Sequence, residues 1–90
     1  MSNMIMVSVF DAAVKNFGPA MCVHSEQAGI RSFMNEVNRN DGANILFTNR
    51  DDFSLYRVGE FDPETGMVVS NDPHPIIHGR DIVFRPAVSE

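Results

Sequence analysis

The first apolar segment of the chain has the two-residue period of a β-strand. Between residues 4 and 11, Ile5, Val7 and Val9 alternate with a second set of residues that is itself largely apolar. Successive side chains of a strand point to opposite faces, so both faces of this strand are expected to be covered. The pattern therefore predicts a central strand of a sheet.

One later segment has the period of an amphipathic helix. Ser25 is a typical N-cap residue, and Glu26 places a carboxylate where the helix dipole favours negative charge. The apolar positions that follow are spaced i, i+3, i+4 and i+7, and they are Ile30, Phe33, Met34 and Val37. This spacing predicts a helix over about residues 25–38 that turns one apolar stripe toward the sheet.

A β-hairpin is predicted over about residues 53–70. Its first strand is rich in aromatic and β-branched residues and is followed by strong turn residues. Asp62 can bond to its own backbone, Pro63 presets φ for a type I turn, and Gly66 can adopt the left-handed conformation that closes a bulged hairpin. Gly59 interrupts the alternation within the first strand, which indicates a bulge.

Two segments outside these elements have weaker patterns. Residues 16–19 have turn chemistry, after which residues 20–24 can run extended as a second strand. The short apolar run at residues 43–47 interrupts a polar loop, and we expect it to dock on the core.

The C-terminal part of the chain contains prolines that limit strand pairing. The last strand of the hairpin is predicted at residues 67–70, because Pro73 and Pro75 lack the backbone donors that a central strand needs. The tail at residues 76–90 contains a β-prone run at 82–84 that is a candidate edge strand.

These elements predict an α+β fold in one domain spanning residues 1–90. A mainly antiparallel sheet of four to five strands packs one face on the single long helix, because only that helix offers a sufficient apolar stripe. The opposite sheet face then needs cover. A homodimer that buries it, with Tyr56 or Val58 at the seam, is the preferred arrangement, and a small, partly open, OB-like barrel is the alternative.

The composition and charge of the chain exclude several classes of protein. The hydrophobic fraction of 43% with seven phenylalanines predicts a folded core rather than a disordered chain. The apolar start at residues 4–7 is too short for a signal or a membrane span, and the single Cys22 excludes an internal disulfide, so the cytoplasm is the expected compartment. The net charge of −5 disfavours indiscriminate binding to phosphate backbones, although a local basic groove can act within an acidic protein.

No constellation in the chain predicts an enzyme, a metal site or a cofactor. The glycines match neither phosphate-binding loop pattern. Three pairs of residues are of types found in metal or catalytic sites, but each is better explained as part of a loop, of the packing or of the solvated surface. These pairs are His74 and His78 among helix-breaking residues, Cys22 and His24 on an extended segment, and Asp51 and Asp52 before a strand.

A weak signal for nucleic-acid binding comes from arginines near an aromatic residue. Tyr56 and Arg57 are adjacent, and a sheet surface with a ring and a cation can stack a base and contact its phosphate, although a regular strand points the two to opposite faces. Arg31 and Arg39, on the helix and its exit, are further candidates for phosphate contacts. The remaining candidates are Lys15, Arg80 and Arg85. They either extend a basic rim or serve only as solubilising charges.

Three segments together resemble a known family. They are the N-terminal strand ending in Asp11-Ala12-Ala13, the helix from Ala28-Gly29-Ile30-Arg31-Ser32-Phe33 to Val37-Asn38, and the hairpin from Leu55-Tyr56-Arg57 to Asp62-Pro63-Glu64-Thr65-Gly66. In this order they are similar to the small non-structural protein of gokushovirus-like Microviridae, which are tailless bacteriophages with circular single-stranded DNA genomes. The resemblance covers most of positions 4–83.

This resemblance implies a non-virion protein of the bacterial host cytoplasm that binds DNA during genome replication, at the switch to single-strand synthesis and packaging. We therefore expect a non-enzymatic protein that binds single-stranded DNA. The family supplies no contact motif, so the site is chosen on chemistry: Arg31, Arg39 and Arg57 on phosphates and Tyr56 stacked on a base. The alternative is an adaptor that recruits viral replication or procapsid proteins without binding DNA.

Overall fold

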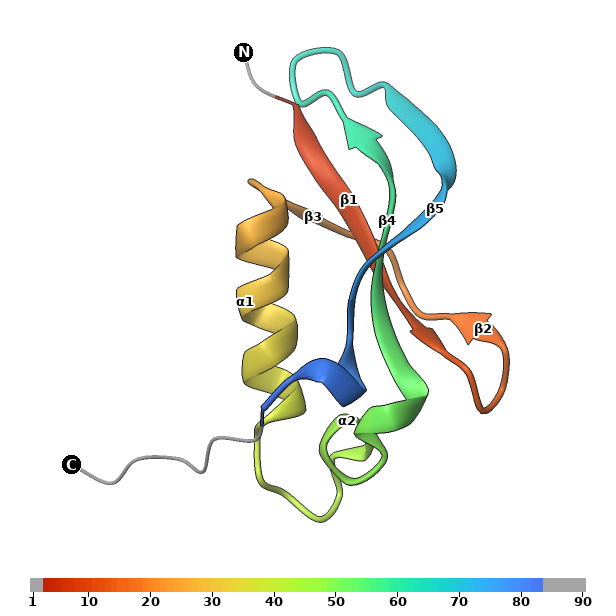
Figure 1. Ribbon diagram of the computed structural model, residues 1–90. Coiled ribbons are helices and arrows are strands. Elements are labelled where there is room, and N and C mark those ends of the chain that lie inside the picture. The colour runs from red at the N-terminus through yellow and green to blue at the C-terminus, as the bar shows by residue number, and fades with distance from the viewer. Residues whose placement is uncertain (1–2, 84–90) are drawn as a thin grey trace, which may run out of the picture.

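The computed structural model describes residues 3–83 as a five-stranded antiparallel sheet with one long helix on one of its faces (Figure 1). In chain order the elements are β1 (Met4–Asp11), β2 (Asn16–Phe17), β3 (Met21–Val23), α1 (Glu26–Val37), α2 (Ile45–Thr48), a 3-10 turn at Arg50–Asp52, β4 (Phe53–Phe61), β5 (Val68–His78) and a second 3-10 turn at Gly79–Asp81. The predicted α+β class, with an antiparallel sheet and one main helix, is confirmed.

β1 is the strand through which the rest of the sheet is joined. β4 pairs with one of its edges, and β2 and β3 pair in succession with the other. β5 then pairs with β4, so the order is β2-β1-β4-β5 with β3 beside β1, and all pairings are antiparallel. The sheet is open, with β5 at one edge and β2 and β3 at the other, rather than the small, partly open, OB-like barrel that was the alternative.

α1 begins and ends close to the positions that its sequence predicts. The Ser25 side chain accepts a hydrogen bond from the backbone N–H of Ala28 at 3.1 Å, which satisfies one of the free donors of the first turn. The helix buries Gly29, Phe33 and Val37 against the sheet. The apolar stripe therefore orients α1, and the predicted helix is confirmed.

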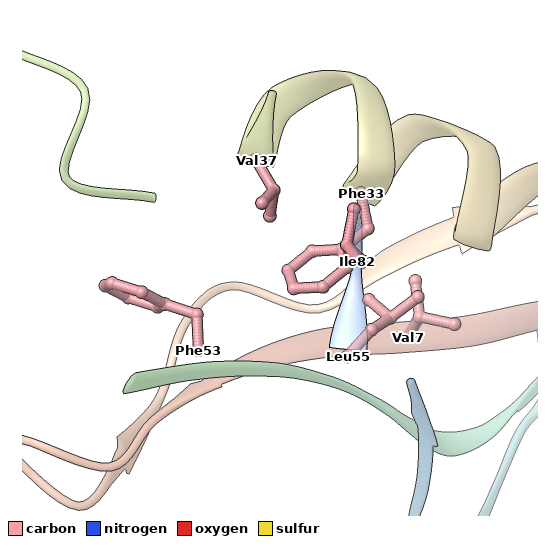
Figure 2. Close-up of a cluster of buried hydrophobic side chains, with 6 residues drawn as sticks. All are labelled: Val7, Phe33, Val37, Phe53, Leu55 and Ile82. Atoms are coloured by element: carbon pink, nitrogen blue, oxygen red, sulfur yellow. The ribbon is translucent and has the colours of Figure 1, made fainter. Parts of the chain in front are cut away.

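The core lies between α1 and the sheet (Figure 2). Val7 from β1 and Leu55 from β4 meet Phe33 and Val37 from α1, and each of the four is at most 4% exposed. Fully burying a side chain of this kind contributes about 1.5–3 kcal/mol, so these contacts hold α1 on the sheet. The remaining members of the buried cluster are Phe53 and Ile82.

A bulge in β4 lies where the sequence predicts one. Consecutive residues of β1 pair with Arg57 and Gly59, which leaves Val58 as the extra residue on β4. Glycine is required beside it, because a Cβ on Gly59 would lie 2.5 Å from the carbonyl oxygen of Val69 on β5. The bulge and the close approach of β5 therefore depend on the same position.

The turn between β4 and β5 follows its predicted chemistry. The Asp62 carbonyl accepts from the Gly66 N–H at 2.7 Å, and its carboxylate accepts from the Glu64 N–H at 2.9 Å. Gly66 has a φ of 77°, the left-handed conformation that closes the hairpin.

The apolar run at residues 43–47 docks on the core, as expected. Asn44 is buried, accepts from the Leu46 N–H at 3.2 Å, and donates its side-chain amide to the carbonyls of Glu36 and Arg39. These bonds hold α2 against the end of α1, and Leu46 packs on the buried cluster.

The prediction of a turn at residues 16–19 is wrong for Asn16 and Phe17, because these two residues form β2 and pair with β1. The chain reverses earlier, at residues 12–15, where Lys15 adopts a φ of 59°. Pairing brings the ring of Phe17 to 4.8 Å from that of Phe10, and such a cross-strand aromatic contact stabilises the strand pair.

β5 is longer than predicted, since it continues past Ser70 through Pro73 and Pro75 to His78. A proline is tolerated on an edge strand because the side facing away from the sheet needs no partner. The register with β4 also shifts between Ile77 and Pro75 and again between His74 and Ser70, so the missing donors do not interrupt a regular ladder.

The C-terminal segment forms no edge strand up to residue 83. Ile82 instead packs into the core, and its carbonyl accepts from the Arg50 guanidinium at 2.9 Å. The same guanidinium donates to the Asn38 side chain at 2.9 Å, so Arg50 joins the end of α1 to the C-terminal segment. The third residue of the predicted strand, Phe84, lies outside the described residues.

We predict that Gly79→Ala is strongly destabilising. An added Cβ would collide with the carbonyl oxygens of Arg50 and Phe53, which are backbone atoms that cannot rotate away. Such overpacking costs about 1–3 kcal/mol. Chemical denaturation measures the loss, with Gly42→Ala as the matched control, because nothing lies within 4 Å of a Cβ at that loop position. Equal unfolding midpoints for the two variants would show that the contact is easily relieved.

Candidate nucleic-acid interface

Three aromatic side chains gather on the sheet face that α1 does not cover, which we call the open face. Because Val7 and Leu55 point into the core, the alternation of a strand sends Phe10 and Tyr56 to the opposite side. β2 adds Phe17 directly across from Phe10. The open face thus receives one ring from each of three adjacent strands.

The three rings form a closed set of contacts. The ring centroids of Phe10 and Phe17 lie 4.8 Å apart, those of Phe10 and Tyr56 lie 5.7 Å apart, and those of Phe17 and Tyr56 lie 5.2 Å apart. All three pairs are tilted or edge-on, the geometries that aromatic quadrupoles favour. The three rings therefore pack as one cluster.

The exposure of these rings distinguishes them from ordinary core residues. Contacts of this kind contribute stability in any sheet. In this protein, however, Phe17 is 42% exposed, and Phe10 and Tyr56 are only half-buried. Partly exposed rings on an open sheet are suited to stacking against the flat face of a ligand.

Polar groups border the aromatic cluster on the open face. The Ser54 hydroxyl lies 2.7 Å from Nδ1 of His78, across the β4–β5 pairing. On β1, the buried Ser8 hydroxyl donates to the carbonyl of Gly18 at 2.7 Å, which fastens the link between β2 and β3. The face therefore combines apolar rings with a small number of hydrogen-bonded polar groups.

Tyr56 and Arg57 lie on opposite faces of the sheet. Tyr56 belongs to the aromatic cluster, whereas Arg57 lies on the side of α1 and is 74% shielded at its side chain. Its guanidinium contacts the carboxylates of Glu26 at 3.3 Å and Glu60 at 2.6 Å. Arg57 thus links β4 to the start of α1, and the structure does not bring it together with Tyr56.

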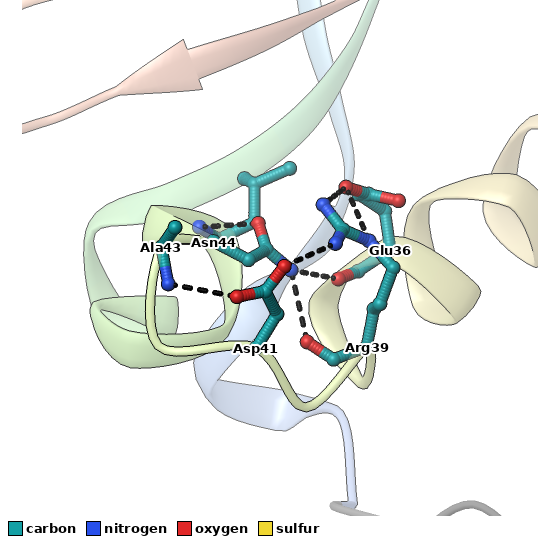
Figure 3. Close-up of polar contacts among 6 residues, drawn as sticks. Glu36, Arg39, Asp41, Ala43 and Asn44 are labelled. Carbon is teal, nitrogen blue, oxygen red and sulfur yellow. Dashed lines mark hydrogen bonds and ion pairs between the residues drawn. The ribbon is translucent and has the colours of Figure 1, made fainter.

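Arg39 is also held by two carboxylates (Figure 3). Its guanidinium lies 2.6 Å from Glu36 and 3.0 Å from Asp41, beyond the end of α1. The hydrogen bond from Arg39 lowers the pKa of Glu36, and the Glu36 carboxylate raises the pKa of Arg39 in turn. Asp41 also has a lowered pKa, chiefly because its carboxylate accepts from the backbone N–H of Ala43.

Three other cations have no ion pair within residues 3–83. Arg31 is exposed on α1, away from the aromatic cluster. Lys15 is exposed in the β1–β2 turn, and Arg80 is exposed in the 3-10 turn after β5. By the register of the sheet, Lys15 and Arg80 follow the strand ends that carry Phe10 and His78, so both lie at the aromatic end of the sheet.

Sequence reasoning identified one member of the aromatic cluster and missed the other two. Tyr56 is a candidate by its type and its neighbour, but Phe10 reads as one more apolar residue of a central strand. Phe17 lies in a segment with turn chemistry. The available signal was the alternation itself, which sends Phe10 to the face opposite Val7 once one face is assigned to the helix.

The described residues contain neither a metal-binding cluster nor a membrane-spanning helix. Across residues 3–83, no three His, Cys, Asp or Glu side chains are grouped so that they could hold a metal ion. Over the same residues, no helix has the length and apolar character needed to cross a membrane.

A family model described as Phage ORF5 protein matches residues 4–82 of the chain. The match includes every strand and helix described above. No curated protein and no solved structure matches the chain.

We predict that Arg39→Ala changes the pKa values of Glu36 and Asp41 differently, although both carboxylates contact Arg39. The pKa of Glu36 should rise toward its ordinary value because its main hydrogen bond is lost, whereas that of Asp41 should stay lowered by the Ala43 N–H. Both folded-state pKa values lie below the unfolded ones, so their contribution to stability is present at neutral pH and is lost as the pH falls through the folded values. Carboxyl NMR titration of both proteins measures this, and a rise at Asp41 without one at Glu36 would contradict it.

Proposed function

This chain belongs to the Phage ORF5 protein family, and we propose that it is a non-enzymatic phage protein that binds single-stranded DNA through the open face of its sheet. The observation that carries the proposal is the partly exposed cluster of Phe10, Phe17 and Tyr56. Stacking of bases on aromatic side chains is tolerant of sequence, since every base has a π-face. Duplex DNA keeps its bases stacked inside, so such a surface favours single strands.

The phosphates of the same strand need cations near the cluster. Lys15 and Arg80 lie in the turns that follow β1 and β5 at the end of the sheet that carries Phe10 and His78, and we assign the backbone contacts to them. The sequence-based assignment to Arg31, Arg39 and Arg57 stays a prediction. The geometry favours it less, because Arg39 and Arg57 are each engaged by two carboxylates, and Arg57 lies on the helix side of the sheet. Arg39 lines the same hollow as Phe17.

The step at which the protein acts is inferred from resemblance. The segments that are similar to the non-structural protein of gokushovirus-like Microviridae support a role in genome replication or packaging. In such a phage both steps handle single-stranded DNA in the bacterial cytoplasm, where we therefore expect the protein to act. Binding with little base preference suits a strand that must be covered along its length.

An adaptor function is the second candidate, and the tip of the β4–β5 hairpin supports it. Met67, Val68 and Val69 are consecutive apolar residues with exposures of 64%, 57% and 61%. Contact with a viral replication or procapsid protein, or with a second copy of the chain, would bury them. A dimer formed at this tip leaves Tyr56 free, whereas the dimer expected from the sequence would bury it.

The two candidates give different results in simple binding measurements. An adaptor captures a purified viral partner and leaves labelled DNA free even at low salt. A DNA-binding protein retains the labelled strand at low salt and releases it as salt rises. Light scattering of the protein alone reports whether a second copy is bound.

We predict that Tyr56→Ala and Phe17→Ala each weaken the binding of a fluorescent oligo(dT) roughly 5- to 150-fold, the range expected for the loss of one stacked base. Fluorescence anisotropy at low salt measures the affinity. Met21→Ala is the matched control, because Met21 is 48% exposed on β3 but pairs with Val7 on the helix side. The proposal fails if all three variants bind as the parent does, or if the parent leaves the oligonucleotide free.

We further predict that Lys15→Gln and Arg80→Gln each lower the salt dependence of binding. Each lost phosphate contact should reduce the slope of log affinity against log salt by roughly 0.7 for a single strand. Arg39→Gln and Arg57→Gln, measured in the same way, test the competing assignment. A larger change of slope in the second pair than in the first would move the phosphate path to the helix side of the sheet.

A further inference from the structure

One row of side chains crosses the open face from edge to edge and changes character halfway. The register places Phe17, Phe10, Ser54 and His78 opposite one another on β2, β1, β4 and β5. With strands about 4.8 Å apart, the row is about 14 Å long. Its first half is aromatic, and its second half consists of a hydroxyl and an imidazole.

Ser54 and His78 act as one hydrogen-bonding unit. Their side chains are joined at 2.7 Å through Nδ1 of the imidazole, which leaves Nε2 for another partner. If Nδ1 accepts from the hydroxyl, Nε2 carries a proton and donates. If Nδ1 donates, Nε2 accepts and the hydroxyl donates. In either tautomer the pair offers one donor and one acceptor.

The distance from the rings to this pair fits the size of a nucleobase. A base stacked on Phe10 lies one strand spacing, about 5 Å, from Ser54 and about twice that from His78. A base is wide enough to turn its polar edge toward the pair while its face covers the ring. Each of the four bases carries a donor beside an acceptor on its Watson–Crick edge, which the two tautomers can match in either order.

We propose that Ser54 and His78 hydrogen-bond the polar edge of a base stacked on Phe10. This inference rests on the proposed binding of single-stranded DNA, and it assigns to that site a contact with the base itself. The pair recognises that a base is present, without selecting one of the four. A purely structural role is the competing explanation, in which the pair only fastens β5 to β4.

The test compares two single strands with the same phosphates and the same stacking area. One is oligo(dT), and the other carries the apolar thymine isostere difluorotoluene, which stacks but has no good hydrogen-bonding edge. We expect His78→Ala to weaken oligo(dT) binding roughly 2- to 10-fold, as for one or two hydrogen bonds, and to leave binding of the isostere strand unchanged. His74→Ala is the matched control, since His74 pairs with Arg57 on the other face of the same strand.

Each outcome of this comparison has one meaning. Equal weakening of both strands by His78→Ala would indicate a backbone or structural role and would overturn the inference, as would no change in either. Ser54→Ala keeps the imidazole and should also weaken binding of oligo(dT) without weakening binding of the isostere strand. This variant replaces His78→Ala as the test if thermal unfolding shows that His78→Ala is unfolded. Weaker binding of both oligonucleotides by Tyr56→Ala supports the site itself. A parent protein that binds neither oligonucleotide rejects the proposed function together with this contact.

Discussion

The packing of Phe33 and Val37 on Val7 and Leu55 determines which face of the sheet is covered, and the other features of the surface follow from that choice. Side chains alternate strictly along a strand, so directing Val7 and Leu55 toward the helix directs Phe10 and Tyr56 away from it. One helix of twelve residues covers only one face of a five-stranded sheet. The aromatic residues of the other face are therefore left partly in contact with solvent, where a ligand can reach them.

Two arginines of this acidic protein are each paired with two carboxylates. Glu26 and Glu60 engage Arg57, and Glu36 and Asp41 engage Arg39, so these carboxylates neutralise arginines on the helix side or beyond the end of α1. A net charge of −5 opposes general contact with a phosphate backbone, and Asp81 lies beside Arg80 in the second 3-10 turn, so the proposed contact depends on Lys15 and Arg80. Ion pairs as exposed as those of Arg39 contribute little to stability, but they occupy the guanidinium that a phosphate would otherwise contact.

The open face and the hairpin tip suit different partners. The face is aromatic with fixed polar groups at one end, which fits a flat, polar-edged ligand such as a base. The tip presents Met67, Val68 and Val69 without aromatic rings or paired polar groups, which fits burial against another protein. Because the tip and the aromatic end lie at opposite ends of the β4–β5 pairing, both contacts can form on one molecule. Membership in a phage protein family agrees with either use.

Local patterns in the sequence determined the elements. β1 and β4 have the bounds that alternation predicts, Ser25 caps the helix, and residues 62–66 form the predicted turn, because periodicity, caps and turns depend on neighbours a few residues apart. Of the candidate site, only Tyr56 was identified in this way. Phe10, Phe17, Ser54 and His78 are far apart in the chain and become one row only through strand order and register. Alternation assigns Phe10 to a face, but tertiary structure alone decided the row, since strand order and register join residues that are far apart in the chain.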